Sequence, residues 1–173
     1  MVAPMPDSAV PEAGGRAGRA HVITVSDRSH SGGRPDASGP VAVAALVEAG
    51  FETTLEVIPD GESAVSDALS AAVASGAELV VTSGGTGVGP RDRTPEGTRA
   101  VIDREIPGIA ELLRLRGLEA SPHAVLTRGV AGIVDGRTLI VNLPGSPKAV
   151  REGIEVLLPL VPHLIDQLKG GDH

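Results

Sequence analysis

The sequence predicts an α/β fold: a mostly parallel sheet in three layers, with helices on both faces and one added hairpin. Short apolar runs alternate with helical stretches of about ten residues, which predicts parallel strands because a parallel connection needs a long crossover. Asp135-Gly136 lies between two apolar runs and predicts the hairpin, since both residue types tolerate a tight turn. We expect a single domain over residues 20–173. Residues 1–19 are rich in Pro, Ala and Gly and lack periodicity, so we expect a disordered tail there.

In the N-terminal half, strands are expected where β-branched and apolar residues cluster between turn residues, at 21–25, 51–58 and 78–82. A loop rich in Ser, Gly and Pro follows the first strand and leads to a helix over 41–49, which ends at Gly50. A second helix is expected over 63–75. Ser63 is its expected N-cap, and Gly76 ends it.

In the C-terminal half, Thr94-Pro95-Glu96 predicts a helix start, with Thr94 as the N-cap and Pro95 at the first helical position. The expected helices span residues 95–103, 109–115 and 148–168, the last interrupted near Pro159 and Pro162. The two strands of the hairpin are expected at 129–134 and 138–142.

The composition excludes several classes of function. The net charge of −7 argues against nucleic-acid binding, which requires a basic face. The absence of Cys excludes disulfides, cysteine zinc sites and thiol catalysis. No apolar run approaches the roughly 18 residues of a membrane-spanning helix, and the N-terminus lacks the pattern of a signal peptide. We therefore expect a cytoplasmic protein with no membrane partner.

The most informative stretch of the chain is the loop after the third expected strand. It contains four glycines before Arg91 and Asp92, at positions 84, 85, 87 and 89. Glycine lets the backbone approach a ligand closely, and a loop of this kind before a helix start can bind an anion through backbone N–H groups. We expect the anion to be a phosphate. The loop lacks the lysine of a P-loop and the spacing of a Rossmann fingerprint. The alternative is an ordinary strand-to-helix turn.

Polar residues follow four of the expected strands, at Ser26-Asp27, Asp60, residues 83–92 and residues 142–146. In an open parallel sheet, ligands bind beyond the carboxyl ends of the strands, so these residues are expected to converge. Carboxylates beside a phosphate repel it unless a cation lies between them, and Mg²⁺ is the usual cation. This combination predicts metal-assisted phosphoryl or nucleotidyl transfer.

Each of these charged residues also has a purely structural interpretation. Asp27 and Asp60 are good turn residues, and Asp92 stands where an acid stabilises a helix N-terminus. Arg91 could stabilise charge on the transferring phosphorus. Lys148 could equally be a solvated lysine in the first turn of a helix.

The chain resembles the MoaB/Mog family of molybdenum-cofactor proteins. The resemblance is carried by Thr-Ser-Gly-Gly-Thr-Gly, Pro-Arg-Asp and Thr-Pro-Glu at positions 82–87, 90–92 and 94–96. Three further segments are similar to loops of the family: Val-Ser-Asp-Arg from position 25 with Gly32, Ile-Pro-Asp from position 58, and Asn-Leu-Pro-Gly-Ser-Pro-Lys from position 142. The resemblance covers residues 21–168. Arg93 departs from it, because many relatives have an apolar residue there.

The resemblance implies a molybdopterin-binding α/β fold, commonly a homotrimer, that acts with other proteins of molybdenum cofactor biosynthesis. It implies transfer of AMP from Mg-ATP to the terminal phosphate of molybdopterin, with release of pyrophosphate. The catalytic acids, which would also hold Mg²⁺, fall on Asp60 and Asp92. The residues expected to bind molybdopterin and phosphate, from the resemblance and the strand ends together, are Ser26, Asp27, Ser83, Gly84, Gly85, Thr86, Gly87, Arg91, Asn142, Pro144, Gly145, Ser146 and Lys148.

Two alternatives to this enzyme remain. One is a MoaB-like carrier or scaffold that binds molybdopterin without chemistry. The other is an unrelated nucleotide-binding enzyme of the flavodoxin or Rossmann type, which the glycine spacing disfavours.

Overall fold

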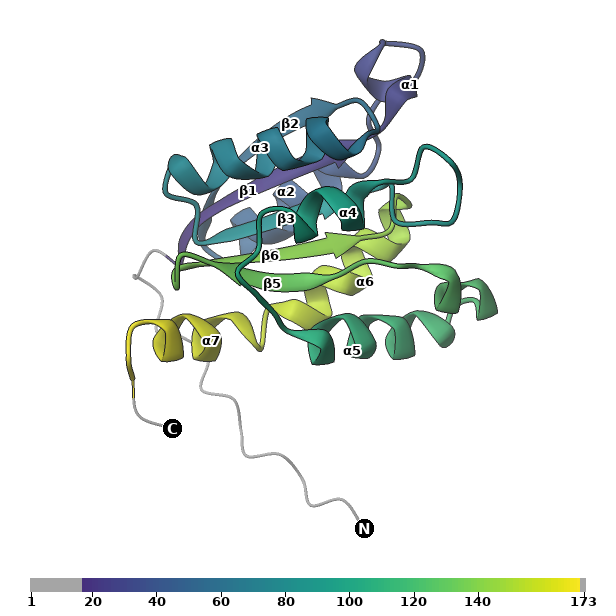
Figure 1. Cartoon of the computed structure of the whole chain (residues 1–173). Coiled ribbons are helices and arrows are strands. Elements are labelled where there is room, and N and C mark those ends of the chain that lie inside the picture. Colours follow the sequence, from purple (N-terminus) through teal and green to yellow (C-terminus); the bar gives the residue numbers. More distant parts are fainter. Residues whose placement is uncertain (1–16, 172–173) are drawn as a thin grey trace.

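A six-stranded sheet lies at the centre of the computed structural model, which describes residues 17–171 (Figure 1). The strand order is β2-β1-β3-β6-β5-β4. The first four strands in this order run parallel to one another, and β5 and β4 are antiparallel to their neighbours. The strands are β1 (Gly18–Val25), β2 (Phe51–Ile58), β3 (Leu79–Ser83), β4 (Arg104–Glu105), β5 (Ala131–Val134) and β6 (Thr138–Leu143).

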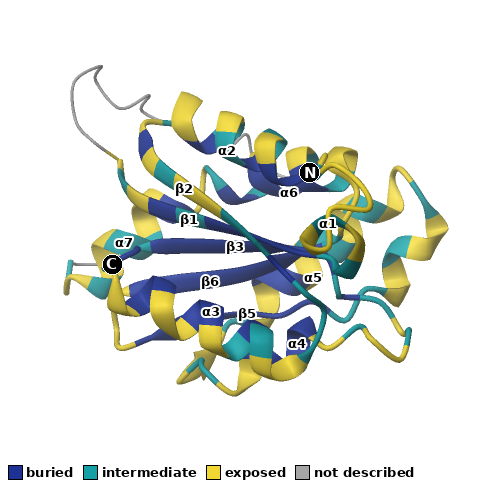
Figure 2. Cartoon of the chain, turned by 90° about the horizontal axis from the view of Figure 1, so that it is seen from above, coloured by how far each residue is buried: buried dark blue, intermediate teal, exposed yellow. Residues whose placement is uncertain are grey.

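Helices cover both faces of this sheet, so the predicted fold class is confirmed (Figure 2). One face packs against α3 (Glu62–Ala74) and α4 (Thr94–Arg99). The opposite face packs against α2 (Gly39–Glu48), α5 (Pro107–Leu118), α6 (Pro147–Leu157) and α7 (Val161–Leu168). Two short elements complete the chain, the helix α1 (Asp27–His30) and the 3₁₀ helix η1 (Pro122–Leu126).

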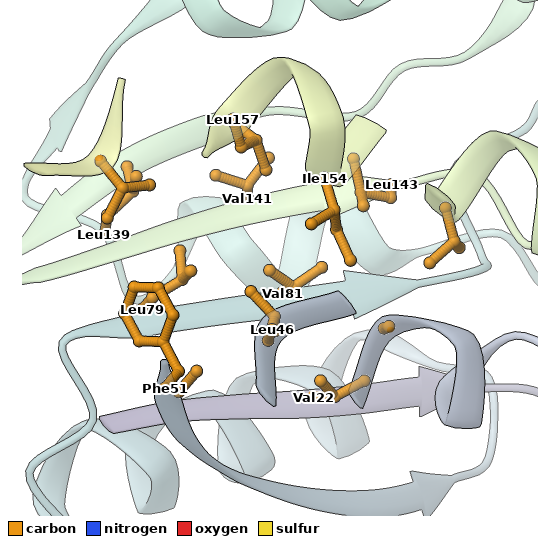
Figure 3. Packing of buried hydrophobic residues seen from close by; sticks show 14 of the residues in the cluster. Val22, Leu46, Phe51, Leu79, Val81, Leu139, Val141, Leu143, Ile154 and Leu157 are labelled. Carbon is orange, nitrogen blue, oxygen red and sulfur yellow. The ribbon is translucent and has the colours of Figure 1, made fainter. Parts of the chain in front are cut away.

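The central strands are buried on both sides, which explains why they read as continuous apolar runs. In β3, Leu79 and Val81 point into the core beneath α2 and α6, and Val80 points into the core beneath α3. Figure 3 shows Leu79 and Val81 packed with Leu46 of α2 and Ile154 of α6. Burial of one aliphatic side chain stabilises the folded state by about 1.5–3 kcal/mol, so these packed layers hold the strands firmly in this order.

The predicted hairpin is confirmed by its pairing and by its turn. The strands β5 and β6 pair antiparallel from Ala131 opposite Val141 to Val134 opposite Thr138. Asp135 and Gly136 between them have φ values of 53° and 63°. Positive φ at both central residues is the geometry that matches the twist of a two-stranded ribbon.

The start of the first strand differs from the prediction, because Gly18 and Arg19 belong to β1 and not to the tail. The backbone N–H of Arg19 donates to a carboxylate oxygen of Glu78 at 3.2 Å, and its carbonyl accepts from the Glu78 N–H at 2.9 Å. Polar partners hold these two residues, so an apolar pattern could not reveal them. Residues 1–16 of the expected tail lie outside the described residues.

The helix boundaries also differ in detail. Gly61, not Ser63, occupies the N-cap position of α3, and Thr94 is the first residue of α4 and not its cap. The helix predicted over 95–103 ends at Arg99, because the chain after it pairs with β5 as β4. The interruption expected near Pro159 is confirmed, since the helices α6 and α7 are separate. No helix within residues 17–171 has both the length and the apolar character needed to cross a bilayer.

Candidate active site

The site lies at the carboxyl ends of the parallel strands. The strand β1 lies between β2 and β3 in the sheet. The helix α2 connects β1 to β2 on one side, and α3 then connects β2 to β3 on the other side, across the opposite face. Because the strand order reverses at this point, a crevice opens between the ends of β1 and β3. A cavity of about 840 Å³ occupies this position. Its lining includes Ser26, Asp60, Ser83 and Gly145, one from each of the four expected strand ends. The predicted convergence of these strand ends is therefore confirmed.

The glycine loop borders the cavity, and two of its glycines are required by its geometry. Gly84 has a φ of +102°, and a Cβ there would overlap the carbonyl oxygen of Val25 at the end of β1. Gly85 has a φ of +65°, and a Cβ there would overlap Oγ1 of Thr94. Any other residue type would push the loop away from the strand ends, so glycine keeps its backbone within reach of a ligand.

The charges that line the cavity are mixed, and acids outnumber bases. Four carboxylates and two guanidinium groups contribute, from Asp27, Asp36, Asp60, Asp92, Arg28 and Arg34. A pocket that only stored phosphate would be lined mainly by donors and cations, because bare carboxylates repel an anion. The chemistry of the site therefore depends on which of the four acids are already neutralised within the protein.

Asp27 and Asp36 are fully engaged. Asp27 accepts two hydrogen bonds from Arg91, at 3.1 Å from Nε and 3.0 Å from Nη2, and one from the backbone N–H of Asp60 at 3.0 Å. The guanidinium of Arg91 thereby lowers the pKa of the Asp27 carboxyl. Asp36 accepts from the hydroxyl of Thr24 at 2.8 Å, and its other oxygen binds the first backbone N–H groups of α2.

Asp60 and Asp92 each keep one oxygen unused. Oδ2 of Asp60 accepts from the backbone N–H of Asp27 at 2.8 Å, and Oδ2 of Asp92 accepts from the N–H of Gly89 at 2.9 Å. Within residues 17–171 neither Oδ1 accepts a hydrogen bond. Both carboxylates border the glycine loop, because Asp60 lies beside Gly85 and Asp92 lies beside Gly89.

Two unused carboxylate oxygens beside a loop that is predicted to bind phosphate suit Mg²⁺, which proteins commonly hold through one or two carboxylates together with substrate phosphates and water. The described residues contain no group of three or more His, Cys, Asp or Glu side chains arranged for a metal ion. The remaining ligands would therefore come from a bound phosphate and water.

The family described as probable molybdopterin binding domain matches residues 21–163. This chain belongs to that family. The match covers most of β1, the other five strands, the helices from α1 to α6 and all four loops that line the cavity.

Similar proteins agree with this membership in the molybdopterin-binding family. The chain is 40% identical to a molybdopterin adenylyltransferase of Pyrococcus furiosus over 148 residues, which are 83% of this chain and 87% of that protein. It is 39% identical to a molybdenum cofactor biosynthesis bifunctional protein of Synechococcus elongatus, matching 89% of this chain but spanning only 48% of that protein. The solved structure of MoaB from Thermus thermophilus superposes with a TM-score of 0.80 at 47% identity, covering 88% of this chain and 96% of that one. The resemblance to MoaB/Mog proteins is therefore confirmed.

Some residues predicted for the molybdopterin-binding site lie outside the first cavity. Pro144 and Lys148 line a second cavity of about 400 Å³ between α5, η1 and α6. Lys148 is exposed and lies 3.8 Å from the carboxylate of Glu152. Ser146 lines both cavities, and its hydroxyl caps α6 by accepting from the N–H of Ala149 at 3.1 Å. Except for Arg91, the predicted binding residues, Asn142 included, thus line one or both of two adjoining cavities.

Asn142 is held inside the protein by three hydrogen bonds, although it stands in a predicted binding segment. Its side-chain oxygen accepts from the N–H of Val130 at 3.1 Å. Its amide donates to the hydroxyls of Thr82 at 3.0 Å and Thr98 at 2.9 Å. These bonds tie β6 to β3 and α4, so the structure gives this side chain a clear packing role.

Among the other predicted binding residues, the hydroxyls of Ser83 and Thr86 also have partners within the protein. Ser83 donates to Oγ of Ser38 at 2.9 Å, and Oγ1 of Thr86 accepts from Thr127 at 3.0 Å. What the loop offers to a ligand is therefore mainly its backbone. The guanidinium of Arg91 lies at the rim, paired with Asp27.

Sequence reasoning did not select Arg28, Arg34 or Asp36 as cavity residues, since they lie in a segment expected to be an irregular loop. One available signal was Asp-x-Ser-Gly-Pro from position 36, which is typical of a helix start.

The structure also explains Arg93, which departs from the family pattern. Its guanidinium donates to the carboxylate of Glu62 at 2.9 Å and ties α3 to α4.

Proposed function

We propose that this protein transfers AMP from ATP to the terminal phosphate of molybdopterin, with release of pyrophosphate, as a step of molybdenum cofactor biosynthesis. The observation that carries the proposal is the pair of unused carboxylate oxygens, on Asp60 and Asp92, beside the glycine loop. Relatives named molybdopterin adenylyltransferase support the assignment. A carrier of anions would gain nothing from bare acids at this position.

In this proposal the reacting groups belong to the substrates. An oxygen of the terminal phosphate of molybdopterin forms a bond to the α-phosphorus of ATP, and the bond from that phosphorus to the bridging oxygen of pyrophosphate breaks. The protein needs no nucleophilic side chain, which agrees with the absence of Cys. Its task is to position both substrates and to balance the charge that they bring together.

Each group of the first cavity has a part in this positioning. The N–H of Gly84 donates to the carbonyl of Leu143 at 3.0 Å, so the backbone N–H groups of residues 85–87 hold phosphate oxygens. Arg28 and Arg34 add positive charge along the triphosphate. Asp60 and Asp92 would hold Mg²⁺. When bound, this ion neutralises phosphate charge and makes the α-phosphorus more susceptible to attack. Arg91, 64% exposed at the rim, braces Asp27 and the carbonyl of Asp60.

The second cavity suits the organic part of molybdopterin. Its lining combines apolar side chains from α5, such as Leu113, with the basic side chains of Arg114 and Lys148. A flat heterocycle can rest on the apolar wall while its terminal phosphate points toward the first cavity past Ser146, which both cavities share.

We also propose that the protein acts in the cytoplasm as a homotrimer, with a single domain that includes Gly18 and Arg19 of β1, alongside other proteins of cofactor biosynthesis. The exposed leucines of α5, Leu112, Leu115 and Leu118, support an association surface. Bifunctional relatives that are about twice as long support a link to a second step of the same biosynthesis.

The test is release of pyrophosphate from ATP in the presence of Mg²⁺, with and without molybdopterin. We expect release only with molybdopterin, and a fall of about 100-fold or more in Asp60→Asn. Asp67→Asn is the matched control, because Asp67 is an exposed acid on α3 outside the cavity. If molybdopterin binds and no pyrophosphate forms at any Mg²⁺ concentration, the protein is a carrier. Tight binding of flavin or NAD would instead favour an unrelated nucleotide enzyme.

A further inference from the structure

Arg128 lies between the two cavities and lines neither of them. It belongs to the segment that joins η1 to β5, where its neighbours Thr127 and Gly129 line the second cavity. Its own side chain points the other way, toward the glycine loop. Nothing in the sequence marked it, because its partners are 32 to 41 residues away along the chain.

The glycine loop is tied at its base by Thr94, whose N–H donates to the carbonyl of Gly85 at 3.1 Å and whose hydroxyl donates to the carbonyl of Gly84 at 2.9 Å. Beyond this base the loop has few hydrogen bonds of its own. A small turn at its tip is closed by the N–H of Asp92, which donates to the carbonyl of Gly89 at 3.1 Å, and by the N–H of Gly89, which donates to the Asp92 carboxylate. A loop with four glycines loses much conformational entropy when it is ordered. Contacts from outside the loop must therefore hold it in one geometry.

Arg128 supplies such contacts to both arms of the loop. Its backbone N–H donates to the carbonyl of Thr86 at 2.8 Å, and Nε donates to the carbonyl of Gly87 at 2.7 Å. Nη2 donates to the carbonyl of Asp92 at 2.7 Å on the returning arm. Nη1 pairs with the carboxylate of Glu96 in α4, and this hydrogen bond lowers the pKa of Glu96. One planar group thus bridges the outgoing arm, the returning arm and the next helix.

The choice of arginine follows from this geometry. A guanidinium has five donors in a fixed plane and can bind two carbonyls and a carboxylate at once. The compact ammonium of a lysine cannot span the same acceptors.

We propose that Arg128 is a positioning residue for AMP transfer, which holds the glycine loop and the backbone of Asp92 in the geometry that binds the phosphates and Mg²⁺. This inference rests on the proposed function. Arg128 acts on the substrates only through the loop. Because displacements of about 1 Å can cost about 100-fold in rate, a loosened loop should slow transfer far more than it destabilises the fold.

The experiment compares Arg128→Gln with Arg93→Gln. Both changes neutralise a guanidinium that faces Glu96, but Arg93 donates no hydrogen bond to a loop carbonyl among the described residues. Hydrogen exchange measured by mass spectrometry reports on the amides of Gly89 and Asp92. We expect their exchange to be about tenfold faster in Arg128→Gln and unchanged in Arg93→Gln.

Steady-state kinetics provide the second measurement. In Arg128→Gln we expect kcat to fall about 10- to 100-fold while the Kd of molybdopterin changes by less than about twofold. Arg93→Gln should retain the kcat of the parent protein. Arg128→Lys keeps the charge beside Glu96 and replaces the Gln variant if that variant is poorly folded. In Arg128→Lys the amides of Gly89 and Asp92 should also exchange faster than in the parent protein, but by a smaller factor.

The proposal is overturned if the loop amides exchange alike in both Gln variants, or if kcat is unchanged in Arg128→Gln. Faster exchange spread evenly over the whole chain in both the Gln and Lys variants would also overturn it, since Arg128 would then stabilise the fold as a whole. If the parent protein makes no product, the proposed function fails. In that case, hydrogen exchange of the loop amides and the Kd of a non-hydrolysable Mg-ATP analogue decide the role of Arg128. Faster exchange and weaker binding in Arg128→Gln would show that Arg128 holds the loop in a geometry that binds phosphate.

Discussion

Replacing Gly85 by Ala should damage the site in a way that can be calculated from the backbone. Gly85 has a φ of +65°, and an added Cβ would overlap Oγ1 of Thr94. That hydroxyl is buried and donates to the carbonyl of Gly84 at 2.9 Å. The methyl group must therefore shift either the loop or Thr94 at the start of α4.

The expected magnitude has two parts. An L-residue in the left-handed region costs about 1–2 kcal/mol. Displacing the hydroxyl of Thr94 from its buried acceptor costs about 1–3 kcal/mol more. The free energy of unfolding should fall by about 2–5 kcal/mol, which leaves a domain of ordinary stability still folded at 25 °C. AMP transfer should fall by about 100-fold or more, because the loop backbone moves away from the phosphate site.

Gly136→Ala is the matched control for Gly85→Ala. Gly136 has nearly the same φ, +63°, in the hairpin turn, and a Cβ there meets no atom within 4 Å. Its variant should lose about 1–2 kcal/mol and keep full activity. Urea denaturation gives the stabilities, and a pyrophosphate assay gives the activities. If both variants lose the same stability and Gly85→Ala remains active, the reasoning about the loop is wrong.

Three further changes test other parts of the structure. Asn142→Ala removes three buried hydrogen bonds and should lower the free energy of unfolding by about 2–4 kcal/mol, measured by urea denaturation. Lys148→Ala should leave stability within about 0.5 kcal/mol, since its ion pair with Glu152 is exposed, but should raise the Kd of molybdopterin measured by calorimetry. The hydrogen bond from Arg128 lowers the pKa of Glu96, so its contribution to stability is present above the ordinary carboxyl pKa of about 4.3 and is lost as pH falls through the lowered value. When unfolding is measured from pH 7 to pH 3, the free energy of unfolding should therefore fall less steeply in Glu96→Gln than in the parent protein.

The fold class was predictable because strand and helix lengths, turn residues and alternation all agreed with one another. The hairpin followed from Asp135-Gly136, whose turn geometry is local. The start of β1 was not predictable, since Arg19 is held by Glu78 through polar contacts between distant residues. Local pattern thus predicts the longer elements well and their ends less well, and it did not predict the short elements α1, β4 and η1.

The position of the site was predictable from the strand ends, but the state of each carboxylate was not. Asp27 and Asp60 are 33 residues apart and exchange two hydrogen bonds, which leaves one oxygen of Asp60 unused and none of Asp27. Such details depend on long-range geometry. The same is true of Arg128, which belongs to no motif although it donates hydrogen bonds to three carbonyl groups of the loop.

The most direct test of the account is mass spectrometry of the pterin after incubation of the protein with molybdopterin, ATP and Mg²⁺. We expect adenylylated molybdopterin from the parent protein and from Asp67→Asn. We expect almost none from Asp92→Asn, although this variant should bind molybdopterin as tightly as the parent. Equal product from Asp92→Asn, or bound but unmodified molybdopterin with the parent protein, would contradict the assignment of the two acids to catalysis.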